Sequence, residues 1–447
     1  MEKIKFFPHQ EAALKATEGM NRVAYFHDMG LGKTFTGAEK AMQMGNKTIL
    51  VICQKSKVDD WINHFKTYYD KQVFDLTKPK QLREFQGYSI GEKYTVVGVI
   101  NYDLAWRRKI LLTLHNFTMM LDESSLIQNT SSKRTKFILA LDPASVILLS
   151  GTPTSGKYER LWSQAHLLGW PISEKVYDTQ YVNYKLIEIG GFKHKIVNPD
   201  DPYKNIERLK QKFRDHGACF LKTEDVFDLP DQTFIPVKVP VTKEYKKFKK
   251  DCLIDIDLVN LHEFKDDSDF YGNDMTPHLL LVGDSLLSKR LYMKQLCTAY
   301  NPNKIKAVKD LIESTQDRLI IFYCYNCELD QLLMACHSLE RPVSVVNGKQ
   351  KDLSAYENIP NSVTLIQYQA GAMGLNLQKA NKIVYFSLTE SVDLWMQSQK
   401  RIHRIGQNRP CFYYVMTCTG SIEERIMNAL NRGVDYTDEL FREEEKQ

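Results

Sequence analysis

The sequence predicts an α/β protein with two domains, each built on a parallel β-sheet that helices cover on both faces. Its 447 residues exceed one domain of about 100–200 residues. Short runs of β-branched and aromatic residues are almost continuously apolar, as in strands that are buried on both faces. These runs alternate with longer amphipathic segments in two separate blocks, which is typical of two α/β domains.

The composition is that of a soluble protein, with 26% charged and 43% hydrophobic residues. Sixty Lys and Arg residues against 55 Asp and Glu give a net charge of +5, which permits a polyanionic partner without requiring one. No apolar stretch approaches the length of a membrane span, and the N-terminal MEKIKFFPHQ has no signal-peptide core. Nine cysteines without framework spacing predict reduced thiols in a cytosol-like compartment.

The first block predicts a domain over 1–165. Its expected strands are 24–26, 48–53, 94–100, 117–122 and 145–150. The segment 166–300 has a different character, with amphipathic helical stretches and polar loops, and we expect a mainly helical insertion with an inter-domain crossover. Residues 228–242 contain three prolines and predict a hinge or a crossover, and 263–274 is an acidic loop. The second block predicts a domain over 301–447, with strands at 318–325, 342–346, 362–367, 382–387 and 412–418.

A glycine loop follows the first strand, in the sequence HDMGLGKT (27–34). A strand, a glycine loop, Lys-Thr and a helix form an arrangement that can hold phosphates, because backbone N–H groups of Gly30 to Lys33 point at the ligand. Lys33 would reach the β- and γ-phosphates, and Thr34 would ligate magnesium. The generic pattern has Gly where this chain has His27, and a simple glycine turn remains the alternative.

Two more strand ends carry candidate groups. In MMLDESS (119–125), Asp122 would hold magnesium and Glu123 would polarise the attacking water. In LLSGTP (148–153), Ser150 and Thr152 would couple the phosphate site to the other domain. Taken alone, each motif is equally consistent with a solvated polar loop or turn.

The second domain carries QSQKRIHRIGQ (397–407). On a helix, Gln397, Arg401 and Arg404 would lie on one face. The two arginines would then enter the γ-phosphate site as arginine fingers, which contribute about 10³–10⁵ in rate. The alternative interpretation is a solvated basic helix.

Together these motifs resemble helicase superfamily two, and within it the Swi/Snf-type DNA-dependent ATPases, from about Phe7 to about Leu430. The resemblance is carried by HDMGLGKT, ILVICQKSKVDDW, VINYD, LDESS, LLSGTP, QAGAMGLNL, HRIGQ and SIEERI. It implies two RecA-like lobes and a Gln10 that reads adenine. By motif position, the resemblance implies that five further residues bind ATP: Met29, Leu31, Gly32, Gly374 and Gln397. It also implies that four residues contact nucleic acid: Ser56, Asn101, Tyr102 and Asn376.

The chain departs from the family pattern at four positions. Ser125 replaces the His of D-E-A-H, Gln369 replaces an Arg, His27 replaces an acidic residue and Ser150 replaces a Thr. Lys33 and the other catalytic candidates are unchanged, so we expect activity. The resemblance is to a minimal motor of bacterial or viral type, which would be cytoplasmic in a bacterium or infected host cell and nuclear in a eukaryote.

The expected function is an ATP-dependent translocase that uses ATP and Mg²⁺ and moves on DNA, mainly duplex. Basic residues Lys55, Lys57, Lys133 and Arg134 would add salt-dependent phosphate contacts. We expect a monomeric motor with no membrane partner, and a protein partner that the sequence does not identify. A strand-separating or annealing helicase is the alternative, although no strand-splitting hairpin can be read from the sequence. A nucleic-acid-binding module with a vestigial ATPase is a lesser one.

Overall fold

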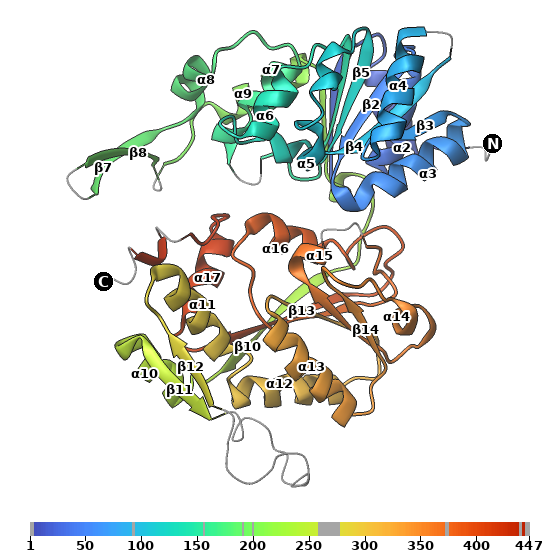
Figure 1. Cartoon of the computed structure of the whole chain (residues 1–447). Helices are drawn as coiled ribbons and strands as arrows, with labels where there is room; N and C mark the ends of the chain where they lie inside the picture. The colour runs from blue at the N-terminus through green and yellow to red at the C-terminus, as the bar shows by residue number, and fades with distance from the viewer. Residues whose placement is uncertain are drawn as a thin grey trace. The chain divides into compact units, whose positions relative to one another are not determined.

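A computed structural model describes residues 4–91, 94–154, 157–189, 192–198, 201–257, 278–371, 375–437 and 440–442. The chain forms two compact units, unit 1 (Met1–Asp228) and unit 2 (Leu229–Gln447), which Figure 1 shows as a blue-to-green and a green-to-red part. The boundary between the units falls inside the segment 166–300, which the sequence analysis treats as one insertion.

Unit 1 is built on a seven-stranded sheet in which every pairing is parallel. In spatial order the strands are β3 (Gln72–Asp75), β4 (Val96–Asn101), β2 (Thr48–Cys53), β5 (Phe117–Asp122), β6 (Ser145–Leu149), β1 (Arg22–His27) and β9 (Ala218–Leu221). The expected strands 48–53 and 117–122 match β2 and β5 residue for residue. Both faces of these strands are buried, so their sequences are continuous apolar runs.

Helices cover both faces of this sheet. Alternate residues of each strand point to opposite faces, so Tyr25 packs in one apolar cluster and Phe26 in the other. One cluster includes α1 (Pro8–Ala16), α2 (Lys33–Gln43) and α3 (Val58–Tyr69). The other includes α4 (Pro79–Gly91), α5 (Tyr102–Ala105), α6 (Lys133–Leu139), α7 (Trp162–Leu167), α8 (Glu174–Tyr181) and α9 (Ile206–Asp215).

Unit 2 is built on a six-stranded sheet that is also parallel throughout. Its strands in spatial order are β10 (Gln232–Val239), β17 (Cys411–Cys418), β16 (Lys382–Tyr385), β13 (Leu319–Tyr323), β15 (Val363–Gln367) and β14 (Val343–Val346). The two sheets confirm the predicted α/β class. The segment 228–242, expected to be a hinge or crossover, begins at the boundary between the units and continues as β10. This strand forms the edge of the sheet, the place where a strand tolerates Pro236.

The helices of unit 2 also form two layers. One apolar cluster includes α12 (Pro302–Glu313) and α13 (Asn326–Ser338). The opposite cluster includes α10 (Lys243–Asp251), α11 (Leu286–Cys297), α16 (Val392–Gln399) and α17 (Ile422–Asn431). The short helices α14 (Ser354–Asn358) and α15 (Tyr368–Gly371) flank β15.

The segment 166–300 is less helical than expected. Besides α8 to α11 it contains two antiparallel hairpins, β7 (Tyr184–Ile189) with β8 (Phe192–Val197) and β11 (Leu253–Asp257) with β12 (His278–Val282). The acidic loop 263–274 lies outside the described residues. None of the described helices has the length and apolar character to cross a membrane. All nine cysteines carry free thiols.

Candidate active site

The predicted groups of unit 1 lie along one edge of its sheet. In a parallel sheet the loops that follow the strands emerge at the same edge. The glycine loop follows β1, Asp122 ends β5, and Ser150 follows β6, which lies between those two strands. Leu149 of β6 is in register with both Tyr25 and Asp122. The sheet topology therefore brings together three motifs that are distant in sequence.

The glycine loop needs glycine at two positions. Gly30 has φ +92° and Gly32 has φ +73°, a left-handed conformation that other residues adopt only with strain. A Cβ on Gly32 would also lie 2.3 Å from Nε2 of Gln10. Gly32 is followed directly by α2, so the N-terminus of this helix and its unpaired N–H groups face the loop, as in phosphate-binding sites.

Lys33 is folded back over this loop. Its Nζ donates hydrogen bonds to the carbonyl oxygens of His27 (2.8 Å) and Asp28 (3.2 Å). A Cβ on Gly151 would lie 3.2 Å from the same Nζ, so the turn after β6 approaches the lysine closely. Asp28 is held in turn, because its Oδ2 accepts from the backbone N–H of Thr223 at 3.1 Å. The ammonium group therefore lies between the glycine loop and the turn after β6.

His27, at the position of the family's acidic residue, is fully buried. Burial, together with the nearby Lys33 and His9, lowers the pKa of His27 to about 3. The imidazole is therefore neutral at physiological pH. The departure from the family pattern replaces a charged side chain with a neutral one beside the phosphate loop.

Gln10 is buried against the glycine loop, and both the oxygen and the nitrogen of its side-chain amide form hydrogen bonds with the backbone. Its Oε1 accepts from the N–H of Phe7 at 2.8 Å, and its Nε2 donates to the carbonyl of Gly32 at 3.1 Å. Next to it, the rings of Phe7 and His9 stack at 5.7 Å, and Phe227 meets both edge-on. Adenine reading by Gln10 stays a prediction, and the geometry adds that Gln10 positions the loop.

Asp122 is held by a residue to which the sequence analysis assigned no role. The indole Nε1 of Trp61, on α3, donates to Oδ2 of Asp122 at 2.8 Å. Burial raises the pKa of Asp122, and the Trp61 hydrogen bond and Lys33 oppose this shift. A buried indole N–H needs an acceptor, which is the signal that could have identified Trp61. The next residue, Glu123, has φ +55°, a strained conformation of the kind that clusters at functional sites.

A polar network connects the carboxylate loop to the turn after β6. Ser124 Oγ donates to Oε1 of Gln164 at 2.8 Å, and Gln164 Nε2 donates to the carbonyl of Pro153 at 3.1 Å. Gln128 Nε2 reaches the same carbonyl at 2.9 Å. Ser150 is fully buried, and its Oγ accepts from the N–H of Thr152 at 3.2 Å. The two loops are therefore joined by hydrogen bonds within unit 1.

In unit 2 the predicted helix over 397–407 is wrong in its second half. The helix α16 ends at Gln399, and residues 401–406 form turns. The amide of Gln407 donates to the carbonyls of Gln378, Ala380 and Ile402, which fixes this segment against the GLNL loop. Gln397, Arg401 and Arg404 therefore do not share a helix face.

The two arginines are nevertheless held together by the GLNL loop. Arg401 is 2% exposed, and its Nη1 donates to the carbonyl of Leu375 at 3.5 Å. Arg404 is half-buried, and its Nη1 donates to Oδ1 of Asn376. Burial lowers the pKa of the Arg404 guanidinium. Gly374 lies outside the described residues.

The predicted nucleic-acid contacts divide into two kinds. Ser56, in the 3₁₀ turn η1 (Lys55–Lys57) after β2, and Asn376 are exposed. Asn101 and Tyr102 are buried, 4% and 2% exposed. The Tyr102 hydroxyl donates to the carbonyl of Asp122 at 3.0 Å. The position of Tyr102 therefore supports a role in holding the carboxylate loop and not in surface contact with a strand.

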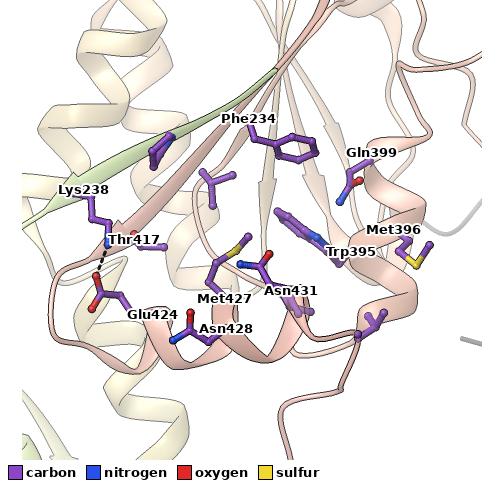
Figure 2. Close-up of a pocket in the computed structure, with 15 residues that line it drawn as sticks. Phe234, Lys238, Trp395, Met396, Gln399, Thr417, Glu424, Met427, Asn428 and Asn431 are labelled. Atoms are coloured by element: carbon purple, nitrogen blue, oxygen red, sulfur yellow. Dashed lines mark hydrogen bonds and ion pairs between the residues drawn. The ribbon is translucent and has the colours of Figure 1, made fainter. Parts of the chain in front are cut away.

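Unit 2 also has a groove of about 850 Å³ between β10, β17, α16 and α17. Figure 2 shows Phe234 and Trp395 at one end of it and Lys238 paired with Glu424 at the other. None of the residues that line it is among those predicted to bind ATP, magnesium or nucleic acid. The groove therefore does not include the predicted ATP, magnesium or nucleic-acid contacts, although Gln399 and Glu424 of its lining belong to the motifs QSQKRIHRIGQ and SIEERI.

Comparisons with known proteins agree with this arrangement of motifs. Residues 16–295 match the SNF2-related domain, and residues 303–406 match the helicase conserved C-terminal domain. A probable ATP-dependent DNA helicase of Arabidopsis thaliana, CHR23, is 24% identical over 91% of this chain. Two Bacillus subtilis proteins are also 24% identical: the putative ATP-dependent helicase/translocase YwqA over 93% of the chain and the uncharacterised ATP-dependent helicase YqhH over 95%.

The relatives differ from this chain in length. The chain spans 40% of the Arabidopsis protein, 46% of YwqA and 77% of YqhH. Among solved structures, the SWI2/SNF2 ATPase core of Sulfolobus solfataricus in complex with dsDNA matches 99% of this chain and 93% of its own, with 20% identity and a TM-score of 0.45.

Proposed function

The chain belongs to the SNF2-related family of ATP-dependent helicases and translocases, and from that premise we propose that it hydrolyses ATP and moves along duplex DNA. The observation that supports this most directly is the convergence of the glycine loop, the Asp122–Glu123 pair and the Gly151 turn at one sheet edge. Phosphoryl transfer requires mainly positioning and charge stabilisation, and these three loops supply both.

The groups of unit 1 have distinct roles in this proposal. Backbone N–H groups of residues 29 to 33 hold the phosphates, and Lys33 exchanges its two carbonyl acceptors for phosphate oxygens. Glu123 orients the attacking water and accepts its proton. The neutral His27 adds no negative charge that would repel the phosphates. Gln10 fixes the loop and contacts the adenine of ATP.

Magnesium fits the oxygen donors present. Thr34 offers a hydroxyl and Asp122 a carboxylate with one oxygen already oriented by Trp61, and hard oxygen ligands of this kind suit Mg²⁺. Bound there with ATP, the ion would neutralise charge on the phosphates. The pairing of Asp122 with an indole N–H, and not with a cation, leaves the carboxylate charge available to a metal.

Unit 2 supplies the remaining positive charge. We assign Arg401 and Arg404 as the arginine fingers, although they lie in a turn and not on one helix face. Arg404 exchanges Asn376 for the γ-phosphate when the units close on ATP, and Gln397 remains an ATP-binding candidate by motif position. Nucleic acid binding would favour this closure through Ser56 of unit 1 and Asn376 of unit 2, which are both exposed.

The test is ATP hydrolysis at one stated salt concentration with no nucleic acid, duplex DNA, single-stranded DNA or RNA, using the Glu123→Gln variant as the background. We expect the strongest stimulation with duplex DNA. Stimulation chiefly by single strands or RNA would contradict the duplex assignment and favour the strand-separating helicase. ATP binding without turnover on any nucleic acid would favour the vestigial module.

A further inference from the structure

The β7–β8 hairpin is a second feature of unit 1 that can reach DNA. Its two strands pair only with each other, from Tyr184 opposite Val197 to Ile189 opposite Phe192. The turn between them lies outside the described residues. In Figure 1 the hairpin extends away from α8 and from the sheet of unit 1. With six residues in each strand, the ribbon is about 20 Å long.

The base of the hairpin is firmly attached. Tyr184 and Val197 pack against the apolar cluster of unit 1. The Tyr184 hydroxyl donates to Oδ2 of Asp178, on α8, at 2.9 Å, and the Lys195 ammonium lies 3.6 Å from the centre of the Tyr184 ring. An isolated two-stranded hairpin is marginally stable in water, so the packing of Tyr184 and Val197 and the Tyr184–Asp178 hydrogen bond stabilise its base.

Beyond this base the hairpin exposes side chains that suit nucleic acid. Lys185, Lys193 and Lys195 are exposed, against one exposed carboxylate, Glu188. Leu186 is 66% exposed and opposite Lys195 in the register. A leucine in this position does not contribute to the core. The combination of cations with an exposed aliphatic group matches a surface that contacts phosphates and the edges of bases.

The helix α8, which precedes the hairpin, is bonded at its first residue to the segment before α6. The carboxylate of Glu174, the first residue of α8, accepts from the Thr130 hydroxyl at 2.8 Å. Thr130 precedes α6, which begins with Lys133 and Arg134. Those two residues were predicted phosphate contacts. The helix α8 therefore connects the hairpin, which follows its C-terminal end, to the segment before α6 at its N-terminal end.

We propose that the β7–β8 hairpin is a second contact with duplex DNA, in which the ribbon lies in the major groove and its lysines reach the flanking phosphates. The major groove, about 12 Å wide, admits a two-stranded β-ribbon. This inference rests on the proposed function, since it gives the DNA-dependent motor an additional grip on its track. Duplex RNA does not offer the same contact, because the major groove of A-form RNA is too narrow for a ribbon.

The test compares two charge-reversal variants of the full chain. One carries Lys185→Glu, Lys193→Glu and Lys195→Glu. The control carries Lys15→Glu, Lys66→Glu and Lys80→Glu, which make the same charge change at exposed positions on α1, α3 and α4. A third variant joins Lys185 to Ile196 through an Asn-Gly turn, which shortens the hairpin and keeps its Tyr184–Val197 base.

Each protein is titrated with a labelled duplex over a range of salt concentrations, and its ATP hydrolysis is measured in parallel. We expect both hairpin variants to bind duplex at least about tenfold more weakly than the control. The slope of log affinity against log salt should also fall by about 2 to 3 for the charge-reversal variant, since each lost phosphate contact removes about 0.9. Turnover at saturating DNA should stay at the control level.

Two outcomes would overturn the proposal: duplex affinity and salt slope equal to those of the control, or a loss that is larger for single strands than for duplex. If the charge-reversal variant does not fold, the binding of the variant with the shortened hairpin tests the proposal. Failure of the proposed function can be distinguished from failure of the hairpin proposal. If the proposed function is wrong, duplex DNA does not stimulate ATP hydrolysis by the wild-type chain. The binding titration still measures whether the hairpin contacts duplex DNA.

Discussion

In unit 1 the groups that we propose to bind ATP lie on loops at a sheet edge, whereas in unit 2 the two arginines lie in a turn after α16. Lys33 donates to the backbone carbonyls of His27 and Asp28, and Asp122 accepts from the indole N–H of Trp61. Arg401 and Arg404 are bonded within unit 2, to Leu375 and Asn376. The difference suggests that unit 1 binds ATP by itself and that hydrolysis waits for an exchange of partners by Arg404.

The largest effect should come from Glu123→Gln. The amide cannot accept a proton from water, and loss of a general base costs up to about 10⁴-fold. DNA-stimulated phosphate release measures this loss. ATP binding should be retained, because the phosphate loop is intact. The control is Glu39→Gln, which removes a carboxylate bonded to Tyr69 on the same unit. Robust turnover by Glu123→Gln would refute the assignment of unit 1.

The second largest effect should come from Arg404→Ala, which tests the contribution of unit 2. We expect ATP to bind with nearly normal affinity and hydrolysis to fall about 10³-fold, the lower end of the range for an arginine finger. Single-turnover hydrolysis and nucleotide binding separate the two steps. Arg409→Ala, which removes a half-exposed arginine paired with Asp317, is the matched control and should be near normal. If Arg404→Ala cycles normally, the exchange of partners does not occur.

Lys304→Met tests whether unit 2 depends on buried charge. Lys304 Nζ lies 2.6 Å from Oε1 of Glu423, with 0% and 1% of the side chains exposed. Removing one partner leaves the other charge uncompensated, at a cost of about 3–5 kcal/mol. Thermal and denaturant unfolding should show this loss, and the double variant Lys304→Met/Glu423→Leu should recover much of it. A single variant as stable as wild type would mean that the pair contributes nothing.

The smallest effect should come from Trp61→Phe, which keeps an aromatic ring and removes the N–H that orients Asp122. Loss of such a supporting hydrogen bond typically costs about 10–100-fold. We expect a lower kcat and a higher magnesium requirement with little change in the KM for ATP. Trp162→Phe is the control, because it removes an equivalent indole bond, to the carbonyl of Ile172. Equal effects in both variants would mean that Trp61 contributes only through packing and not by orienting Asp122.

Most of the fold followed from the sequence because fully buried parallel strands are visible as continuous apolar runs. The strands β2 and β5 are examples. The edge strand β10 was missed, since its prolines indicate a hinge and its exposed face breaks the apolar run. The β7–β8 hairpin was missed for a related reason: its strands carry lysines and pack against little, so no burial pattern marks them.

The site was predictable where a motif determines local geometry and less so where tertiary contacts do. Gly32 and Lys33 follow from the loop itself. The turn that holds Arg401 depends on the Gln407 amide and three carbonyls from other segments, which no local pattern encodes. Tyr102 is oriented toward the carboxylate loop by burial, and its motif position gave no sign of this.

The central claim is that ATP hydrolysis in this chain drives movement along duplex DNA. Displacement of a third strand from a DNA triplex measures that movement directly, with Glu123→Gln as the negative control. We predict displacement by the wild-type chain that requires ATP and magnesium and that Arg404→Ala slows in proportion to its hydrolysis. Duplex-stimulated hydrolysis without displacement would contradict the claim.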